Sequence, residues 1–83
     1  MGWYINYEVK FDEFVDWDDT HVKHCLKSFN VNFMNLRDHP EMIIIISMYS
    51  QHNISDILDV LYDIYFTDMT YRQYGILTWN KYK

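Results

Sequence analysis

The chain contains no alanine, and it has only two glycines, one proline and one cysteine in 83 residues. The single cysteine, Cys25, cannot form a disulfide within the chain, which favours a reducing compartment. With only Gly2 and Gly75, a glycine-rich phosphate loop is excluded. The longest apolar run, residues 42–46, is too short to span a bilayer, and the N-terminus does not resemble a signal peptide. We therefore expect a cytoplasmic protein with no membrane partner.

Large side chains take the place of the small ones. Eight tyrosines, three tryptophans and five phenylalanines make up 19% of the chain. Because each aromatic ring buries a large apolar area, 83 residues are enough for one domain, residues 1–83, with its own core. The abundance of Ile, Asn, Tyr and Asp beside so little Ala, Gly and Pro is typical of an AT-rich genome. It hints at a phage, a virus or an AT-rich bacterium, and a phage-encoded chain would act in the host cytoplasm.

The charges are distributed unevenly. The net charge is −5, which argues against direct binding of nucleic acid, since phosphates require clustered Lys and Arg. No Lys or Arg lies between Arg37 and Arg72, yet that segment holds six acidic residues. They are Asp38, Glu41, Asp56, Asp59, Asp63 and Asp68. This asymmetry is the main indication of function in the sequence.

The segment 42–49 predicts a central β-strand. It contains four consecutive isoleucines, which are β-branched and favour a pleated strand over a helix. Successive side chains of a strand point to opposite faces, so Ile44 and Ile46 face one way and Ile43 and Ile45 the other. Both faces therefore need cover, as in the middle of a sheet.

Three further strands and two helices are predicted around this segment. Residues 3–11 alternate between apolar and polar and predict a half-buried strand. The other predicted elements are a helix over 20–29, a strand over 31–36, a turn over 37–40, a helix over 55–66 and a strand over 71–82. The short turn indicates an antiparallel hairpin.

Local signals mark the ends of these elements. Asp18 or Asp19 is expected to cap the first helix and Ser55 the second. Asn30 is expected to stop the first helix, and Gly75 marks a bulge or a close contact in the last strand.

The order β-α-β-β-α-β resembles the ferredoxin-like split βαβ arrangement. The resemblance implies an α+β domain with a four-stranded antiparallel sheet, the first and third strands at its centre and both helices on one face. The other face would then carry two isoleucines of the 42–49 strand. Tyrosines of neighbouring strands, a second copy of the chain or another protein would cover them.

Three carboxylates are predicted on one exposed side of the second helix. Asp56, Asp59 and Asp63 lie at helical spacing, with no cation three or four residues away. Along the axis they rise by roughly 4.5 and 6 Å, broadly like the phosphates of a nucleic-acid strand. The stripe indicates either a surface for a basic partner or a solvated face that keeps the protein in solution.

The connection over 12–19 combines acids with aromatic rings. It includes Asp12, Glu13 and Asp16 around Phe14 and Trp17. Tryptophan is enriched among the residues that contribute most of the binding energy at protein interfaces. We therefore predict that Asp12, Glu13, Asp16 and Trp17 extend the partner-binding surface. The alternative is that Trp17 joins the core. A calcium loop is not expected, because the glycine and spacing of an EF-hand are missing.

No enzymatic function is expected. His21 and Cys25 would share one side of the first helix, but no zinc-type spacing accompanies them. A cysteine in an apolar stripe is also poorly placed to ionise as a nucleophile. We therefore expect no catalytic residues, no metal and no cofactor.

These observations favour a small acidic interaction protein. It would bind a basic protein that handles nucleic acid or takes part in host defence, and inhibit or modulate it as a nucleic-acid mimic. The alternative is a homodimeric structural or regulatory domain joined through the open sheet face. A small enzyme or ligand-binding domain is a third reading that no motif supports.

Overall fold

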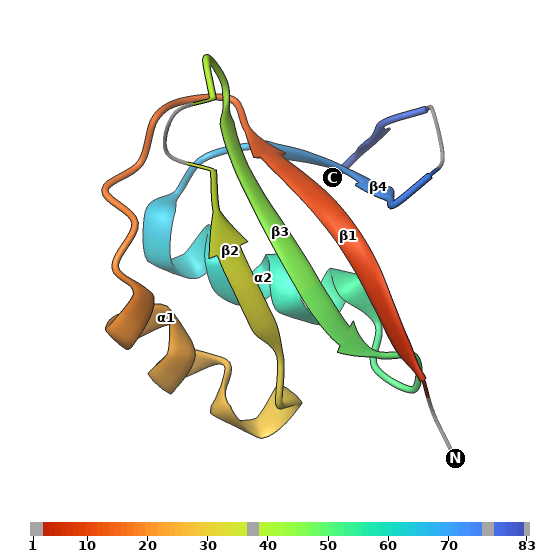
Figure 1. Ribbon diagram of the computed structural model, residues 1–83. Helices are drawn as coiled ribbons and strands as arrows, with labels where there is room; N and C mark the ends of the chain where they lie inside the picture. Colours follow the sequence, from red (N-terminus) through yellow and green to blue (C-terminus); the bar gives the residue numbers. More distant parts are fainter. Residues whose placement is uncertain (1–2, 37–38, 76–77, 83) are drawn as a thin grey trace.

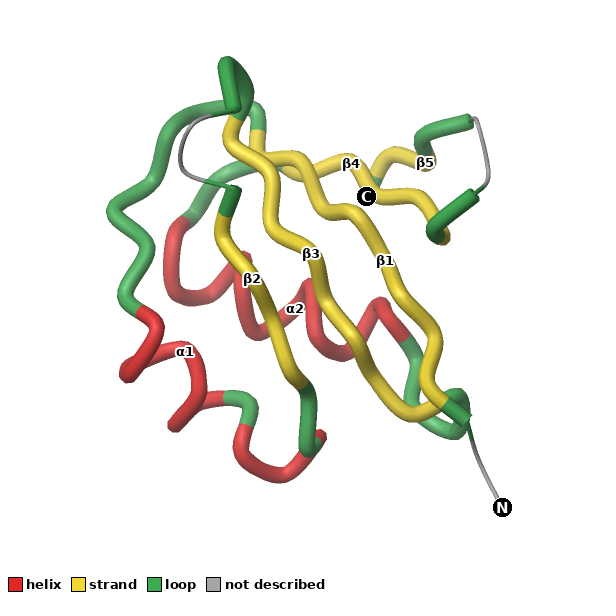
Figure 2. Tube along the Cα trace, viewed as in Figure 1, coloured by secondary structure: helices red, strands yellow, loops and turns green. Residues whose placement is uncertain are grey.

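The computed structural model describes residues 3–36, 39–75 and 78–82. It is an α+β structure in which two α-helices accompany a five-stranded antiparallel sheet of order β2-β3-β1-β4-β5 (Figures 1 and 2). The elements are β1 (Tyr4–Phe11), α1 (Asp19–Cys25), the 3₁₀ helix η1 (Lys27–Phe29), β2 (Asn32–Asn35), β3 (Met42–Tyr49), α2 (Ile54–Tyr65), β4 (Met69–Gln73) and β5 (Asn80–Lys81). The α+β class is confirmed, but the predicted count of four strands is wrong.

The sheet is built around β1 and β3, as the alternation and the isoleucine run predict. They pair antiparallel from Tyr4 opposite Tyr49 to Phe11 opposite Met42. Val9, Ile44 and Ile46 on the inner face of this pair are fully buried. Helix α2 crosses behind that face (Figure 1), and both α-helices contribute to the same core cluster. The helix side of the sheet therefore holds the core.

The helix ends agree only partly with the local signals. The Asp18 side chain accepts a hydrogen bond from the His21 N–H and caps α1, and Asn30 adopts a left-handed conformation with φ 55°. The first helix is shorter than predicted because the chain tightens into η1 after Leu26. The cap of α2 is Asn53, which accepts from the Ser55 N–H, so the prediction of Ser55 is wrong.

The last segment is a hairpin and not one strand. Strand β4 begins at Met69, earlier than predicted, and ends at Gln73. Gly75 has φ +88° and lies in a turn, where a residue without a side chain meets no steric penalty. The chain then returns antiparallel as β5. Part of this connection, and Arg37 and Asp38 of the predicted 37–40 turn, lie outside the described residues.

The second sheet face carries Ile43 and Ile45, the two isoleucines that the alternation assigns to it. Ile43 is only 5% exposed and Ile45 is half-buried. At one end of this face Tyr4 stacks on Tyr49, with ring centroids 4.5 Å apart. One aromatic ring of β1 and one of β3 therefore contact each other at that end of the face.

Charged side chains and Trp79 occupy the β4 side of the second face. Arg72 donates to both carboxylate oxygens of Glu8 at 3.1 and 3.2 Å. The Trp79 ring lies over Lys10 and Arg72, at 4.9 and 4.6 Å from its centroid. The hairpin of β4 and β5 thus contributes one ring that contacts two cations.

Candidate partner-binding surface

The acidic stripe predicted on the second helix lies on the solvent side of α2. Asp56, Asp59 and Asp63 are all exposed. The opposite side of the helix is buried in the core through Ile54, Ile57, Leu58 and Leu61. Amphipathic periodicity alone places the three carboxylates together, because residues three and four apart share one helix side.

The acidic loop, residues 12–19, packs against the C-terminal end of α2. The backbone N–H of Asp12 donates to the carbonyl of Asp68 at 2.9 Å, and that of Asp18 donates to the hydroxyl of Tyr65 at 3.1 Å. The Trp17 and Tyr65 rings stack with centroids 5.8 Å apart. The fold therefore brings two acidic segments, 12–19 and 63–68, side by side.

Together these two segments hold seven of the twelve acidic residues and no Lys or Arg. The seven are Asp12, Glu13, Asp16, Asp18, Asp19, Asp63 and Asp68. The C-terminal end of a helix is the negative end of its dipole, where cations are favoured, yet the last turn of α2 contains no basic residue. The local potential is therefore strongly negative.

Tyr65 responds to this environment. Burial raises the pKa of the Tyr65 hydroxyl, and the nearby carboxylates of Asp18, Asp16 and Asp19 raise it further. The hydrogen bond from the Asp18 backbone acts in the opposite direction and lowers this pKa. The balance is an upward shift, because a phenolate here would be partly desolvated and would lie beside negative charge.

Trp17 does not lie on this surface. Its side chain is only 8% exposed and packs between the rings of Phe33 and Tyr65, while its indole N–H donates to Asp19. The alternative reading, in which Trp17 joins the core, therefore describes its position. Asp12, Glu13 and Asp16 are exposed, as a contact surface requires.

Two exposed phenylalanines, absent from the predicted contact set, accompany the carboxylates. Phe14 in the acidic loop is 71% exposed and Phe66 at the end of α2 is 76% exposed. Phe66 has φ 53°, a conformation that bulky side chains rarely adopt, and its ring contacts the edge of Tyr62. The acidic loop offers no periodicity that would indicate that the Phe14 ring faces outward.

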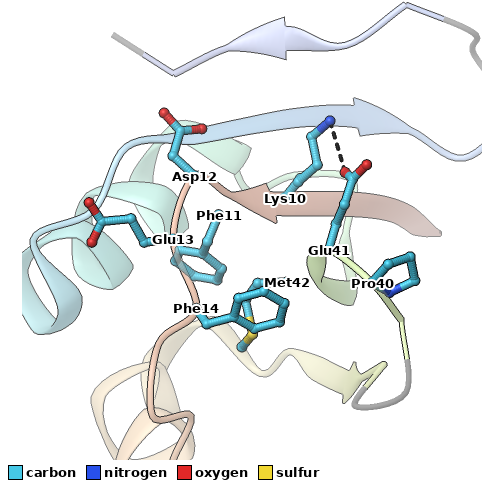
Figure 3. Close-up of a pocket in the computed structure, with 8 residues that line it drawn as sticks. All are labelled: Lys10, Phe11, Asp12, Glu13, Phe14, Pro40, Glu41 and Met42. Atoms are coloured by element: carbon cyan, nitrogen blue, oxygen red, sulfur yellow. Dashed lines mark ion pairs between the residues drawn. The ribbon is translucent and has the colours of Figure 1, made fainter.

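A hollow of about 520 Å³ opens beside Phe14, between the end of β1 and the turn that precedes β3 (Figure 3). It is lined by Lys10, Phe11, Asp12, Glu13, Phe14, Pro40, Glu41 and Met42. Phe14 and Met42 both line it, and the ammonium of Lys10 pairs with Glu41 at 3.1 Å. The carboxylates of Asp12 and Glu13 point away from this ion pair and from the rings of Phe11 and Phe14.

His21 and Cys25 do meet on α1, as their spacing predicts. The Cys25 sulfur lies 3.8 Å from Nε2 of His21. Cys25 is half-buried, so the expectation of a thiol fully packed in the apolar stripe is wrong. Among the described residues, no three His, Cys, Asp or Glu side chains gather in a way that would hold a metal ion.

Comparison of the chain with models of known protein families, with curated proteins and with solved structures found no match. Within the part of the chain that the structure describes, no helix is long and apolar enough to cross a membrane.

Proposed function

We propose that this protein is a small, non-enzymatic interaction module that binds a basic protein through its acidic loop and α2. The observation that carries the proposal is the meeting of segments 12–19 and 63–68, which together contain seven acidic residues and no Lys or Arg. Carboxylates in this arrangement attract Lys and Arg over a long range and accelerate association with a basic partner.

The exposed rings of Phe14 and Phe66 supply apolar contact area, which charged side chains alone do not. Most of the energy of an interface comes from a few buried anchors, often aromatic, whereas exposed charges mainly set rate and specificity. Two rings that project from an acidic surface therefore match a partner with basic residues around apolar hollows. Their exposure supports a contact surface over a merely solvated helix side.

The partner class that we favour is a basic, nucleic-acid-handling or host-defence protein, which this chain inhibits or modulates by occupying its phosphate-binding residues. Asp56, Asp59 and Asp63 support this class, because their rise of roughly 4.5 and 6 Å along α2 is broadly similar to a run of phosphates. Nucleic acid would then compete with this chain for the same cations.

The test is a pull-down from the native host lysate at low salt, with three forms of the protein. The first is wild type, and the second is D56N/D59N/D63N. The third, S28K/N32K/Q51K, changes the net charge by the same amount as the second, but at exposed positions elsewhere on the protein. We expect a basic protein that is retained by the wild type and by the third form, weakened in the second, and released by added DNA or RNA.

Two results would contradict the proposal. Equal retention by the first two forms would show that the carboxylates of α2 are only a solvated surface. Retention that does not change between about 50 and 300 mM salt would exclude an electrostatic interface, because exposed charges are screened over that range.

A homodimer joined through the open sheet face is the second candidate. The observation that favours it is Met34, which is 61% exposed beside half-buried Ile45, with a hollow of about 150 Å³ between β2 and β3. Analytical ultracentrifugation of wild type and Met34→Lys tests it. Self-association that the substitution abolishes and that D56N/D59N/D63N retains would support the dimer.

We also infer that the architecture is a ferredoxin-like arrangement extended at one edge. The order β2-β3-β1-β4 of the first four strands and the two helices between them support it, with β5 as an addition. An experimental structure whose strand order differs would contradict this assignment.

A further inference from the structure

We propose that two copies of this protein join through their open sheet faces and form a bivalent module, with one acidic stripe on each outer side. This inference rests on the proposed function, because the stripe of Asp56, Asp59 and Asp63 is what each copy presents to a basic partner. The homodimer then becomes a form in which that function is carried out, and not an alternative to it.

The sheet separates the two surfaces that such a module needs. Helix α2 lies behind the sheet in the view of Figure 1, and its apolar side is buried in the core through Ile57, Leu58 and Leu61. The acidic stripe is exposed on the other side of the helix, away from the sheet. A contact made by the open face therefore leaves the stripe of each copy exposed to a partner.

Seven uncharged side chains form one continuous area on the open face, which we call the neutral patch. The registers of β2, β3 and β1 place them in adjacent rows, and alternation puts them on the same face. They are Asn32, Met34, Ile45, Ser47, Asn6, Tyr4 and Tyr49. Tyr4 is 49% exposed and Met34 is 61% exposed. Tyrosine and methionine are enriched at protein interfaces, whereas charged residues are depleted from their centres, so the composition of the neutral patch fits a contact surface.

Charge favours a second copy as the occupant of this face. Two molecules of net charge −5 repel each other, and like charges placed opposite each other oppose association. The neutral patch brings no charge into the contact, and next to it Arg72 pairs with Glu8 and Lys10 pairs with Glu41, both at 3.1 Å. The open face can therefore meet its own copy without an excess of negative charge, whereas the acidic loop and α2 cannot.

The neutral patch also combines an exposed side chain with a hollow. Beside Met34, a hollow of about 150 Å³ lies between β2 and β3, with Ile45 and Ser47 in its lining. In a two-fold dimer both copies use the same surface, so each Met34 side chain has a hollow of the other copy to enter. Methionine suits this contact, because its flexible side chain adapts to an irregular space.

The size of the open face predicts a weak dimer. The longest strands, β1 and β3, have eight residues each, which corresponds to about 26 Å of length. The strands β2, β3, β1 and β4 together are about 19 Å wide, so the flat footprint is at most about 500 Å² per copy. Interfaces of standard size bury about 800 Å² per partner. We therefore expect a dissociation constant between about 10 μM and 1 mM.

Sedimentation equilibrium from about 10 μM to 1 mM, in about 0.15 M salt, tests the dimer. Met34→Asp brings a negative charge of each copy into the contact, and Ser28→Asp adds the same charge at an exposed position of η1, outside the sheet. We expect wild type and Ser28→Asp to shift from monomer to dimer, and Met34→Asp to associate at least about tenfold more weakly. A wild type that stays monomeric throughout, or equal association of the two variants, would overturn the proposal.

Bivalence is tested by dissociation from a surface that carries a polyarginine peptide at a low and a high density. A dimer that holds two peptides at once dissociates more slowly from the dense surface, because its second contact is intramolecular. We expect this slowing to be at least about threefold larger for Ser28→Asp than for Met34→Asp, although both carry the same charge. Equal slowing of the two variants would overturn the bivalent module.

The two proposals fail separately. If the dimer forms as expected but no basic partner depends on the acidic stripe, the proposed function is wrong and the self-association through the open face stands. If a basic partner is retained in a salt-dependent manner through the acidic stripe but the wild type is monomeric at about 1 mM, the bivalent module alone is wrong.

Discussion

Phe66 combines two features that folding alone does not favour. It holds a left-handed backbone at the end of α2, which costs an L-residue roughly 1–2 kcal/mol, and its ring is left largely in water. Glycine or asparagine usually occupies such a position. That an exposed aromatic residue retains this unfavourable backbone conformation is consistent with a role of its ring in binding.

We predict that Phe66→Gly is more stable than Phe66→Ala by about 1 kcal/mol, because glycine relieves the left-handed strain and alanine does not. Urea unfolding of the two variants measures this difference in the free energy of unfolding. Both variants should lose partner binding relative to wild type, since both remove the ring. Equal stability of the two variants would show that the backbone at this position is unstrained.

Trp17 and Phe14 lie in the same loop but should behave in opposite ways. Trp17→Ala should lower the free energy of unfolding by about 3–5 kcal/mol, because it removes a buried ring from the core. Phe14→Ala should change it by less than about 0.5 kcal/mol, because the ring is exposed. Thermal or urea unfolding compares them, and a similar loss in both would mean that Phe14 also packs in the core.

At the scale of elements, the acidic loop is attached to α2 through Tyr65. The pKa of its hydroxyl is raised above the ordinary value of about 10, so the folded protein holds this proton more tightly than the unfolded chain. The contribution of this hydroxyl to stability should therefore be constant below about pH 10 and be lost as the pH rises above 10 through the raised pKa.

We predict that Tyr65→Phe flattens this alkaline loss, measured as the free energy of unfolding from pH 8 to the alkaline limit of folding. At neutral pH the variant should lose no more than about 1 kcal/mol, the net value of one hydrogen bond. Some alkaline loss should remain, because burial also raises the pKa of Tyr7. An unchanged alkaline slope in Tyr65→Phe would contradict this account.

We expect the Trp79 ring to stabilise the β4–β5 hairpin against opening. Trp79→Ala removes the ring that lies over Lys10 and Arg72, each contact worth about 0.5–1 kcal/mol. We predict faster hydrogen exchange at the Tyr82 amide, which donates to the Met69 carbonyl at 3.0 Å. Tyr74→Ala, at an exposed ring in the turn after β4, is the control and should leave that amide protected.

At the scale of the whole molecule, the net charge is −5, and seven of the twelve acidic residues lie in the adjacent segments 12–19 and 63–68. Repulsion among these carboxylates opposes folding and is screened by salt, since the Debye length falls from about 30 Å at 0.01 M to 8 Å at 0.15 M. The same concentration of charge supports the proposed attraction of a basic partner.

We predict that Asp63→Asn raises the free energy of unfolding by a few tenths of a kcal/mol at low salt, and that the gain disappears at 0.15 M. Glu41→Gln is the matched control, because Glu41 pairs with Lys10 and its neutralisation should not stabilise. Denaturant unfolding at both salt concentrations measures the effect. A gain in both variants, or in neither, would contradict repulsion among the carboxylates of segments 12–19 and 63–68.

The sequence predicted the structure correctly wherever one side-chain periodicity, that of a strand or of a helix, runs through a whole segment. The alternation in β1 and the isoleucines of β3 predict the central pair and its faces, and the helical spacing predicts the exposed stripe on α2. The predictions of the Ser55 cap and of a single last strand failed because a neighbouring residue supplies an alternative. Asn53 is an equally good cap, and the backbone at Gly75 permits a turn.

The sequence by itself determined the α+β class, the central strands and the acidic character, because these follow from side-chain period and composition. Only the tertiary structure decided which residues of the acidic loop face outward. No side-chain periodicity in the loop predicts which of Trp17 and Phe14 is buried. Trp17 is buried because Phe33 and Tyr65, which are distant in the chain, cover it. The joining of segments 12–19 and 63–68 also depends on long-range hydrogen bonds, which no local pattern encodes.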